Sequence, residues 1–550
     1  MARAIRDQKI LFFVTSPRSP FKMIPDIRLL IDNMEGQQFD KKNQEKFGEL
    51  LRGSNEFKGE AANDAAFSAR DRITRGPKAL GFVDLSPQIK LTPVGERFIN
   101  SSRPHEALTR QLLKFQLPSI FHSGDFKVKP FLEILRLIYN LEKLSKDEIR
   151  LFGLQLTHYS RYEEVEQKIL QFRDELQNRD KSAMSIKTFL DQYATKVAME
   201  IYADEISNLT KAKIRDFITT KKNNMRDYSD ACFRYLRETQ LVTVNRNASY
   251  LYIPSTKLQE VKYILDTVSR DPEVLSVEDF KKYIFDPTLP KLAIDDKNKL
   301  LSILDTFQID KSITQDLSIL QLQDLQEEVI TRHTQSKINE ERLELKTFNN
   351  YNEIIALFGD ITAKRVPDQP LMLEWNIWRA FTMLNDGDIC GNFKTDTEGM
   401  PLSTAPGNKA DIECTYKDFN LNVEVTMSSG NKQYEMENES VARHLGKRKI
   451  DTNKDSYCIF IAPTISEGAL AHFYSLHRIP IKHYGGVSRI IPIALEHFIQ
   501  FLNHAYLNKD KISSQKLLKF LMDSSNKAEN SCDEIEWLDY ISTKCSSWLT

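Results

Sequence analysis

Residues 406–430 read PGNKADIECTYKDFNLNVEVTMSSG, and this stretch decides the fold of the C-terminal part of the chain. Two runs of alternating apolar residues flank the sequence KDFN, a pattern typical of a β-hairpin. A turn at 417–420 places Glu424 opposite Glu413. Asp411 then lies two residues further along the same face, a diagonal neighbour at roughly 7–8 Å. Two carboxylates on adjacent strands predict a site for a divalent cation, because Mg²⁺ prefers oxygen ligands.

The same hairpin predicts the orientation of the neighbouring side chains. Strand alternation puts Thr426 on the face of Glu424 and turns Val423 and Val425 toward the core. The sequence EVT then stands where nucleases of the pattern D-x(n)-E-x-K carry a lysine. The spacing predicts Mg²⁺-dependent phosphodiester cleavage. The alternative is an exposed hairpin with acidic residues on its surface, because such spacings arise by chance in chains of this length.

Several segments, in this order and with approximately this spacing, match the motifs of one enzyme family. They are SPRSP at 16–20, AAFSARDR at 65–72, EWNIW at 374–378, GNKAD at 407–411, EVTMS at 424–428, MENESVARH at 436–444 and YCIFIAP at 457–463. On these motifs the chain resembles the AlwI family of type IIS restriction and nicking endonucleases. The resemblance implies a cleavage half with the PD-(D/E)XK fold. It also implies that the N-terminal half, through about residue 300, reads a short asymmetric DNA sequence.

The resemblance implies a site larger than Asp411 and Glu424. Glu374, on a helix expected over 371–384, would project toward the metal ions. Glu437 would join the metal ligands and His444 would lie close to the scissile phosphate. These two residues are seven positions apart and therefore share one helix face.

The expected ligands of one or two Mg²⁺ ions are Asp411, Glu424, the Val425 carbonyl, and Glu374 or Glu437. The ions would activate a water molecule, and the products would carry a 5′-phosphate and a 3′-hydroxyl.

A threonine cannot do the work of the usual lysine, so another group must help to position or deprotonate the water. His444, Lys432 and Lys409 are the candidates. Each assignment has a structural alternative. Glu374 would be an exposed residue in the first helical turn, where the helix dipole favours an acid. His444 would be a packed or exposed bystander.

Charge is distributed unevenly along the 550 residues. The chain carries 76 Lys and Arg against 77 Asp and Glu, a net charge of −1. Residues 1–130 hold 22 of the basic and 15 of the acidic residues, so their net charge is +7 and that of the remainder is −8. A basic N-terminal part predicts contact with a polyanion. The alternative is a solvated surface with uneven charge.

Cysteine usage and the missing motifs exclude several classes. Six cysteines show no C-x-x-C spacing, and no two histidines stand in a zinc-ligand pattern. We find neither a signal peptide nor an apolar stretch of the roughly 20 residues that a membrane span needs. We therefore expect reduced thiols, no membrane partner, and a location in the cytoplasm of a prokaryotic cell. Walker A, H-E-x-x-H and G-x-S-x-G motifs are absent, which argues against ATP-driven translocation, zinc proteolysis and serine hydrolysis.

Glycine usage predicts the domain organisation. There is no glycine between Gly153 and Gly359, so we expect a mostly helical middle. Residues 311–347 contain neither Gly nor Pro and predict a long helix that separates two domains. The expected parts are a recognition subdomain at 1–130, a second, mostly helical one at 131–300, a helical linker at 301–350 and a cleavage domain at 351–550.

Two segments share the order helix, β-hairpin and helix, which predicts a winged-helix module used twice. In the first, a helix at 64–75 precedes a hairpin at 80–92 and a helix with Thr92 as its N-cap. In the second, a helix at 228–238 precedes a hairpin at 241–253 and a further helix. Such modules place a helix in the major groove of DNA. The same layout occurs in modules that bind only proteins.

The first module has the better chemistry for DNA, because arginine grips phosphate or reads guanine with two hydrogen bonds. The proline-stiffened loop SPRSP adds further phosphate donors. For Arg70 the structural alternative is an ion pair with Asp71 or Glu60. The predicted DNA-binding residues are Ser16, Arg18, Ser19, Ser68, Arg70, Arg72, Arg75 and Lys78.

These observations predict an α+β multidomain protein with a helical winged-helix recognition half, a long helical linker and an α/β PD-(D/E)XK nuclease domain. The resemblance implies a Mg²⁺-dependent type IIS deoxyribonuclease that binds double-stranded DNA and cuts a few base pairs from its recognition site. Its implied partners are a second catalytic domain, from a transient homodimer or a separate nuclease subunit, and a cognate DNA methyltransferase encoded with it. The alternatives are a strand-specific nicking enzyme of the same family and a winged-helix regulator whose hairpin is catalytically dead.

Overall fold

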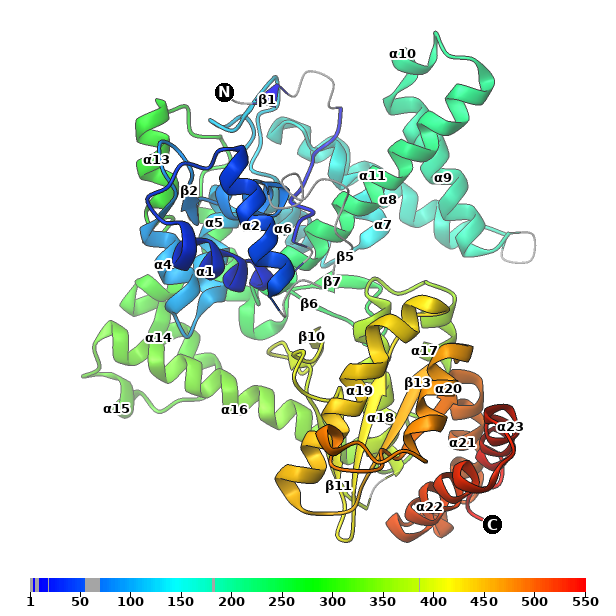
Figure 1. Ribbon diagram of the computed structural model, residues 1–550. Coiled ribbons are helices and arrows are strands. Elements are labelled where there is room, and N and C mark those ends of the chain that lie inside the picture. Colours follow the sequence, from blue (N-terminus) through cyan, green and yellow to red (C-terminus); the bar gives the residue numbers. More distant parts are fainter. Residues whose placement is uncertain (1–2, 5–8, 18, 55–69, 181–183, 385) are drawn as a thin grey trace. The chain divides into compact units, whose positions relative to one another are not determined.

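The computed structural model describes residues 3–4, 9–17, 19–54, 70–180, 184–384 and 386–550. The chain forms two compact units (Figure 1). The N-terminal unit comprises residues 1–245 and 249–329, and the C-terminal unit comprises residues 246–248 and 330–550. Both units contain helices and strands, which confirms the predicted mixture of α and β structure. In the described part of the chain, no helix combines the length and the apolar composition needed to cross a bilayer.

The N-terminal unit is mainly helical. Its helices are α1 (Met23–Met34), α2 (Lys41–Gly53), α4 (Pro93–Asn100), α5 (Pro104–Lys114), α6 (Pro130–Asn140), α7 (Lys146–Leu151), α8 (Tyr162–Asn178), α9 (Ile186–Ile201), α10 (Ala203–Ile206), α11 (Lys211–Glu238), α12 (Leu258–Thr267), α13 (Val277–Phe285), α14 (Lys297–Thr306) and α15 (Lys311–Thr314). The next helix, α16 (Ile319–Leu345), contributes residues to both units. The long helix predicted over 311–347 is therefore interrupted between α15 and α16.

The strands of the N-terminal unit are short. They are β1 (Arg3–Ala4), β2 (Val83–Asp84), β3 (Lys90–Leu91), β4 (His122–Ser123), β5 (Lys143–Ser145), β6 (Thr243–Val244) and β7 (Tyr250–Tyr252). β2 pairs antiparallel with β3, and β7 pairs antiparallel with both β5 and β6. β1 pairs parallel with β4.

Both predicted hairpins are present with helices on either side. In the first, α4 begins after Thr92, whose side chain accepts a hydrogen bond from the Gly95 N–H at 3.0 Å, as the N-cap prediction required. The helix predicted at 64–75 is described only from Arg70, where a helical turn leads into a π-helix (η2, Thr74–Lys78). In the second, α11 ends at Glu238 and α12 follows β7.

The C-terminal unit contains the acidic hairpin sequence of residues 406–430. Its helices are α17 (Tyr351–Thr362), α18 (Gln369–Leu384), α19 (Asn431–Thr452), α20 (Glu467–Leu476), α21 (Leu495–Leu507), α22 (Ser514–Asn530) and α23 (Glu534–Cys545). Its strands are β8 (Asp388–Gly391), β9 (Lys394–Thr395), β10 (Pro401–Ser403), β11 (Ile412–Thr415), β12 (Asn420–Val425), β13 (Ser456–Ala462) and β14 (Ile490–Ala494).

Five of these strands form one mixed sheet in the order β14-β13-β12-β11-β8. β11 pairs antiparallel with both β8 and β12, whereas β13 pairs parallel with both β12 and β14. Parallel neighbours need crossover connections, and α19 and α20 provide them. All seven residues of β13 are buried, as expected for a strand covered on both faces.

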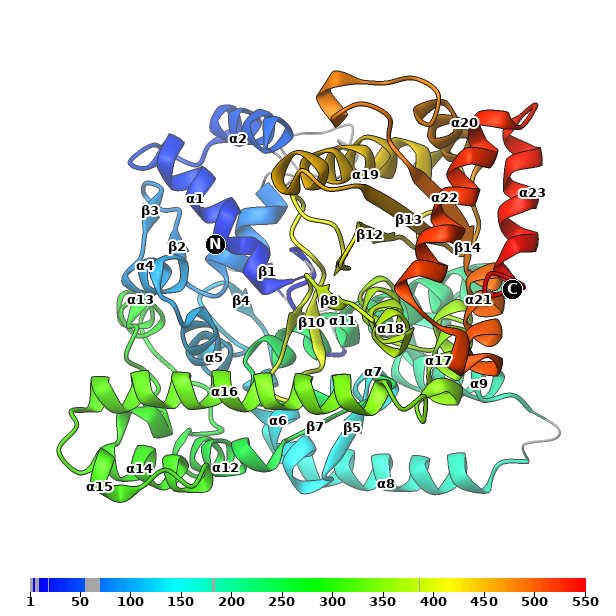
Figure 2. The ribbon, with the colours of Figure 1, turned by 90° about the horizontal axis from the view of Figure 1, so that it is seen from below.

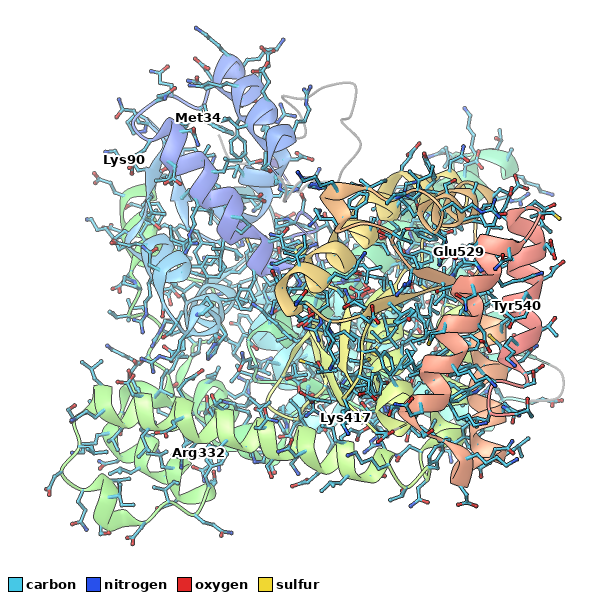
Figure 3. All side chains as sticks on the ribbon, turned by 60° about the horizontal axis from the view of Figure 1, so that its bottom comes forward. Met34, Lys90, Arg332, Lys417, Glu529 and Tyr540 are labelled. Atoms are coloured by element: carbon cyan, nitrogen blue, oxygen red, sulfur yellow. The ribbon has the colours of Figure 1, made fainter. Side chains whose placement is uncertain are left out.

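Helices cover this sheet on two sides. α19 packs along β12 and β13, and α18 packs along β8 and β12. Figure 2 shows α18 and α19 on opposite sides of these strands. In Figure 3, Lys417 marks the turn between β11 and β12, while Glu529 and Tyr540 mark α22 and α23. The ends of β11 and β12 that are distant from this turn lie between α18 and α19, where the candidate site is found.

Candidate active site

The register of the β11–β12 hairpin differs from the predicted one. The N–H of Tyr416 donates to the carbonyl of Phe419 at 3.0 Å, and Glu413 pairs with Asn422. The prediction of a turn one residue later, with Glu413 opposite Glu424, is therefore wrong. The rings of Tyr416 and Phe419 are buried and stack with their centroids 4.5 Å apart. This aromatic pair closes the hairpin earlier than the alternation of apolar residues suggested.

Extended by one residue beyond the start of β11, the observed register brings Asp411 level with Glu424. Residues in direct opposition have Cβ atoms about 4.5–5.5 Å apart, closer than the diagonal neighbours that were predicted. Oδ2 of Asp411 accepts a hydrogen bond from the Val425 N–H at 2.7 Å. Asn392 fixes the backbone here, because its N–H donates to the Asp411 carbonyl at 2.9 Å and its amide donates to the Ala410 carbonyl at 2.8 Å.

Glu424 is buried and contacts α19 through His444. Nδ1 of His444 lies 2.9 Å from Oε1 of Glu424, and Nε2 lies 3.3 Å from the carbonyl of Gly407. A neutral imidazole has one N–H, and a carboxylate and a carbonyl are both acceptors. The tautomer of the neutral ring therefore decides which of the two contacts is a donated hydrogen bond. His444 is buried, which excludes an exposed position, and it joins β12 to the loop before β11. Its catalytic role stays a prediction.

Glu374 on α18 is also buried, with 5 % of its surface exposed. Its Oε2 accepts a hydrogen bond from the Ala405 N–H at 3.3 Å. Burial raises the pKa of Glu374 well above its ordinary value, and the charges of Asp411, Asp368 and Glu424 raise it further. The exposed first-turn alternative is excluded, and the carboxyl is an electrostatic neighbour of the hairpin acids.

Glu437 contacts the end of β12 through Thr426. The Thr426 hydroxyl donates to Oε1 of Glu437 at 2.8 Å and accepts a hydrogen bond from the Ser428 N–H at 3.0 Å. Thr426 is buried. The residue that stands in place of the usual lysine therefore orients a carboxylate on α19.

The chemistry of these side chains fits a divalent cation. In the described residues, no three Asp, Glu, His or Cys side chains already form a complete metal-binding group. Asp411 accepts from the Val425 N–H and Glu424 bonds to His444, so both carboxylates have protein partners in this state. Burial raises the pKa of Glu374, and the nearby carboxyls of Asp411 and Glu424 raise it further, so charging all three groups together carries an electrostatic cost. A cation is the partner that would remove this cost.

Two residues of the site were not among the residues predicted from the sequence. Asp368, just before α18, is near enough for its charge to raise the pKa of Glu374. Gln433 on α19 is completely buried and has three side-chain hydrogen bonds. An acid close to the EWNIW motif could have suggested Asp368, but nothing in the pattern distinguished Gln433. Lys409 and Lys432, the other proposed substitutes for the lysine, are exposed.

Two of the predicted DNA-binding residues, Arg18 and Ser68, lie outside the described residues. Arg72 forms an ion pair with Asp26 on α1. The side chain of Arg72 is 16 % exposed and that of Asp26 is 1 % exposed. This pairing gives Arg72 a structural role, because a buried carboxylate needs a partner.

The remaining predicted DNA-binding residues also have protein neighbours. Arg75 forms an ion pair with Asp71 at 2.8 Å, and the hydroxyl of Ser19 donates to Glu238 at 3.1 Å. Lys78 lies over the ring of Phe121, and burial lowers its pKa. Ser16 is half-buried and Arg70 is exposed. Their roles in DNA binding stay predictions.

The fold and the acidic site agree with the result of a comparison with known families. The chain belongs to the AlwI restriction endonuclease family, whose model matches residues 78–501. The resemblance noted in the sequence is thereby confirmed. Membership in this family makes the protein a DNA endonuclease.

Comparisons with individual proteins are less informative than the family match. No curated protein sequence matches the chain. One similar solved structure is the small subunit, R.BspD6I2, of the heterodimeric restriction endonuclease R.BspD6I. It is 24% identical, covers 35% of this chain and 98% of its own, and has a TM-score of 0.30. Another is the BpuJ1 endonuclease binding domain in complex with pyrene- and phenanthrene-modified DNA. It is 15% identical, covers 50% of this chain and 94% of its own, and has a TM-score of 0.32.

Proposed function

We propose that the protein is a type IIS endonuclease that recognises a short asymmetric DNA sequence with its N-terminal half and hydrolyses the backbone a few base pairs away with its C-terminal half. The observation that carries the proposal is the opposition of Asp411 and Glu424 beside the buried Glu374. A structural hairpin gains nothing from placing two acids beside a buried carboxyl, because each raises the energetic cost of the others' charge. The same point argues against a catalytically dead regulator.

The arrangement of the strands supports a PD-(D/E)XK cleavage domain. An antiparallel set of β8, β11 and β12 is followed by the crossover helix α19 and the parallel strand β13. The acids at the end of the hairpin and on the preceding and following helices support this assignment. Thr426 replaces the usual lysine.

Mg²⁺ is the proposed cofactor, held by Asp411, Glu424 and the Val425 carbonyl with Glu374 or Glu437. When bound, such an ion lowers the pKa of a water molecule and neutralises developing charge on the phosphate. Hydrolysis of the P–O3′ bond leaves a 5′-phosphate and a 3′-hydroxyl.

The protein's own residues have separate tasks in this scheme. His444 contacts the Glu424 carboxyl through Nδ1 and the Gly407 carbonyl through Nε2, so it is suited to hold or transfer a proton near the reacting phosphate. Thr426 orients Glu437 through its hydroxyl. Glu424, Thr426 and His444 are buried, which shields their hydrogen bonds from solvent.

DNA recognition is assigned to the N-terminal half, with residues 1–130 and 131–300 as its subdomains, 301–350 as the linker and 351–550 as the cleavage domain. Two helix–hairpin–helix segments support winged-helix modules there. Arg70 is the best candidate for base or phosphate contact, because it is exposed at the start of the described helix.

The test is to digest a sequenced plasmid in Mg²⁺ and to map the ends by run-off sequencing. A type IIS enzyme gives breaks at a fixed distance to one side of an asymmetric sequence, with ends that DNA ligase rejoins without a kinase. Cuts at random positions, or centred within a symmetric sequence, would contradict the assignment. Breaks that are found in only one of the two strands, even after long digestion, would identify a nicking enzyme.

A further inference from the structure

Gln433, in the first turn of α19, joins three segments of the C-terminal unit. Its side chain is completely buried. Nε2 donates to the carbonyls of Ser428 and Thr464, both at 2.9 Å, and Oε1 accepts from the Ser466 N–H at 2.7 Å. Ser428 follows β12, Thr464 follows β13 and Ser466 caps α20. One amide therefore fixes the ends of both central strands against the start of α19.

The bond to Ser428 closes a ring of hydrogen bonds with the candidate active site. The N–H of Ser428 donates to Oγ1 of Thr426 at 3.0 Å, and the Thr426 hydroxyl donates to Glu437 at 2.8 Å. Gln433 and Glu437 are four residues apart and lie on one face of α19. The ring thus begins and ends on the same helix and passes through the residue that replaces the lysine.

The donor and acceptor pattern requires an amide. Two carbonyls need N–H donors and one backbone N–H needs an acceptor, and the glutamine side chain supplies both groups at one position. A methionine of similar length supplies no N–H donor and leaves all three backbone groups without this partner. A glutamate retains the acceptor for Ser466 and loses both donors.

We infer that Gln433 is a positioning residue for cleavage, which sets the rotation and depth of α19 so that Glu437 faces Thr426 and His444 faces Glu424. This inference rests on the proposed function, in which α19 carries two groups of the active site. Positioning through such outer hydrogen bonds typically changes metal affinity or activity by about 10–100-fold when it is removed.

The experiment compares Gln433→Met, Glu437→Gln and Tyr474→Phe in the full-length protein. Tyr474→Phe is the matched control, because it removes a buried 2.9 Å hydrogen bond to the Ser531 carbonyl in the same unit and leaves α19 untouched. Single-turnover cleavage of a plasmid is measured over a series of Mg²⁺ and DNA concentrations. Thermal unfolding and DNA binding in Ca²⁺ are measured in parallel.

Gln433→Met should lower the cleavage rate constant at saturating DNA by about 10–100-fold and raise the Mg²⁺ concentration for half-maximal rate. Its DNA affinity should match the wild type, and Tyr474→Phe should change neither rate constant nor Mg²⁺ dependence. A folded Gln433→Met protein with the wild-type rate and Mg²⁺ dependence overturns the inference. If this variant does not fold, Gln433→Glu, which keeps the length and the acceptor, is read by the same criteria.

Glu437→Gln distinguishes a failure of the positioning role of Gln433 from a failure of the proposed active site. Loss of cleavage in Glu437→Gln together with wild-type behaviour in Gln433→Met rejects only the positioning role. Wild-type cleavage by Glu437→Gln removes Glu437 from the proposed active site, and the positioning role that Gln433 has through Thr426 and Glu437 is rejected with it.

Discussion

Nδ1 of His444 lies 2.9 Å from Oε1 of Glu424, although the two residues are 20 positions apart in the chain. The contact exists because α19 returns across the sheet between the parallel strands β12 and β13. The same helix brings Glu437 to Thr426. The crossover helix therefore brings groups that precede Gly430 in the chain and groups that follow it together in one site.

Glu374→Gln should stabilise the metal-free protein while it reduces cleavage. Burial and neighbouring acids raise the folded-state pKa of Glu374 above its unfolded value, so this group's contribution to stability is lost as pH rises from about 4. A neutral amide removes that cost and should raise the free energy of unfolding by about 0.5–2 kcal/mol at neutral pH. Thermal unfolding in the presence of EDTA at several pH values measures this change in stability. A variant that is less stable than the wild type at neutral pH would show that this carboxyl is not under electrostatic strain.

His477 should make the C-terminal unit sensitive to acid. Burial lowers the pKa of His477 to about 4, whereas an unfolded histidine titrates near 6.5. The unfolded state binds the proton first, so this contribution to stability is present above about pH 6.5 and is lost as pH falls toward 4. The free energy of unfolding should fall by about 3 kcal/mol over this pH range. His477→Phe should unfold at a temperature that depends less on pH in this range, and an unchanged pH dependence would exclude His477 as the cause.

Arg72→Met should destabilise the protein, because it removes the partner of the buried Asp26. Breaking a buried ion pair from one side typically costs about 3–5 kcal/mol. The double variant Asp26→Asn, Arg72→Met should regain much of the loss in a denaturant titration. Arg70→Met is the comparison for DNA contact and should weaken binding by roughly 1–3 kcal/mol with little effect on stability. If Arg72→Met instead leaves stability unchanged and weakens DNA binding, the ion pair with Asp26 is not its main role.

Nicked plasmid should precede linear plasmid. Each chain supplies one set of Asp411, Glu424 and Glu437, which can hydrolyse one phosphodiester at a time. A second cut requires a second catalytic domain, so the conversion of nicked circles to linear DNA should accelerate with protein concentration. A time course at several concentrations measures both steps. Linear product without a nicked precursor is incompatible with this scheme, and nicked circles that persist at high concentration indicate a pure nicking enzyme.

The sequence predicted the elements of the cleavage half better than their register. Alternation of apolar residues located β11 and β12, and the spacing of Glu437 and His444 placed both on one face of a helix. The register failed because apolar alternation cannot distinguish between adjacent turn positions, and the stacked rings of Tyr416 and Phe419 decided between them.

Long-range pairings were beyond the sequence for a physical reason. The partner of Arg72 is Asp26, 46 residues away, and no local pattern links them. The burial of Glu374 depends on how α18 packs against the sheet. Gln433 binds backbone groups at the ends of two strands. Residues of every type carry such groups, so the identity of these partners could not reveal the contact.

Plasmid cleavage by Asp411→Asn and Glu424→Gln in Mg²⁺ tests the central claim most directly. Both variants should lose cleavage by roughly 100-fold or more, because the cation loses a charged ligand. Both should bind DNA in Ca²⁺ as the wild type does, since recognition is assigned to the N-terminal half. Substantial Mg²⁺-dependent cutting by either purified, folded variant would show that these carboxylates are not the catalytic pair.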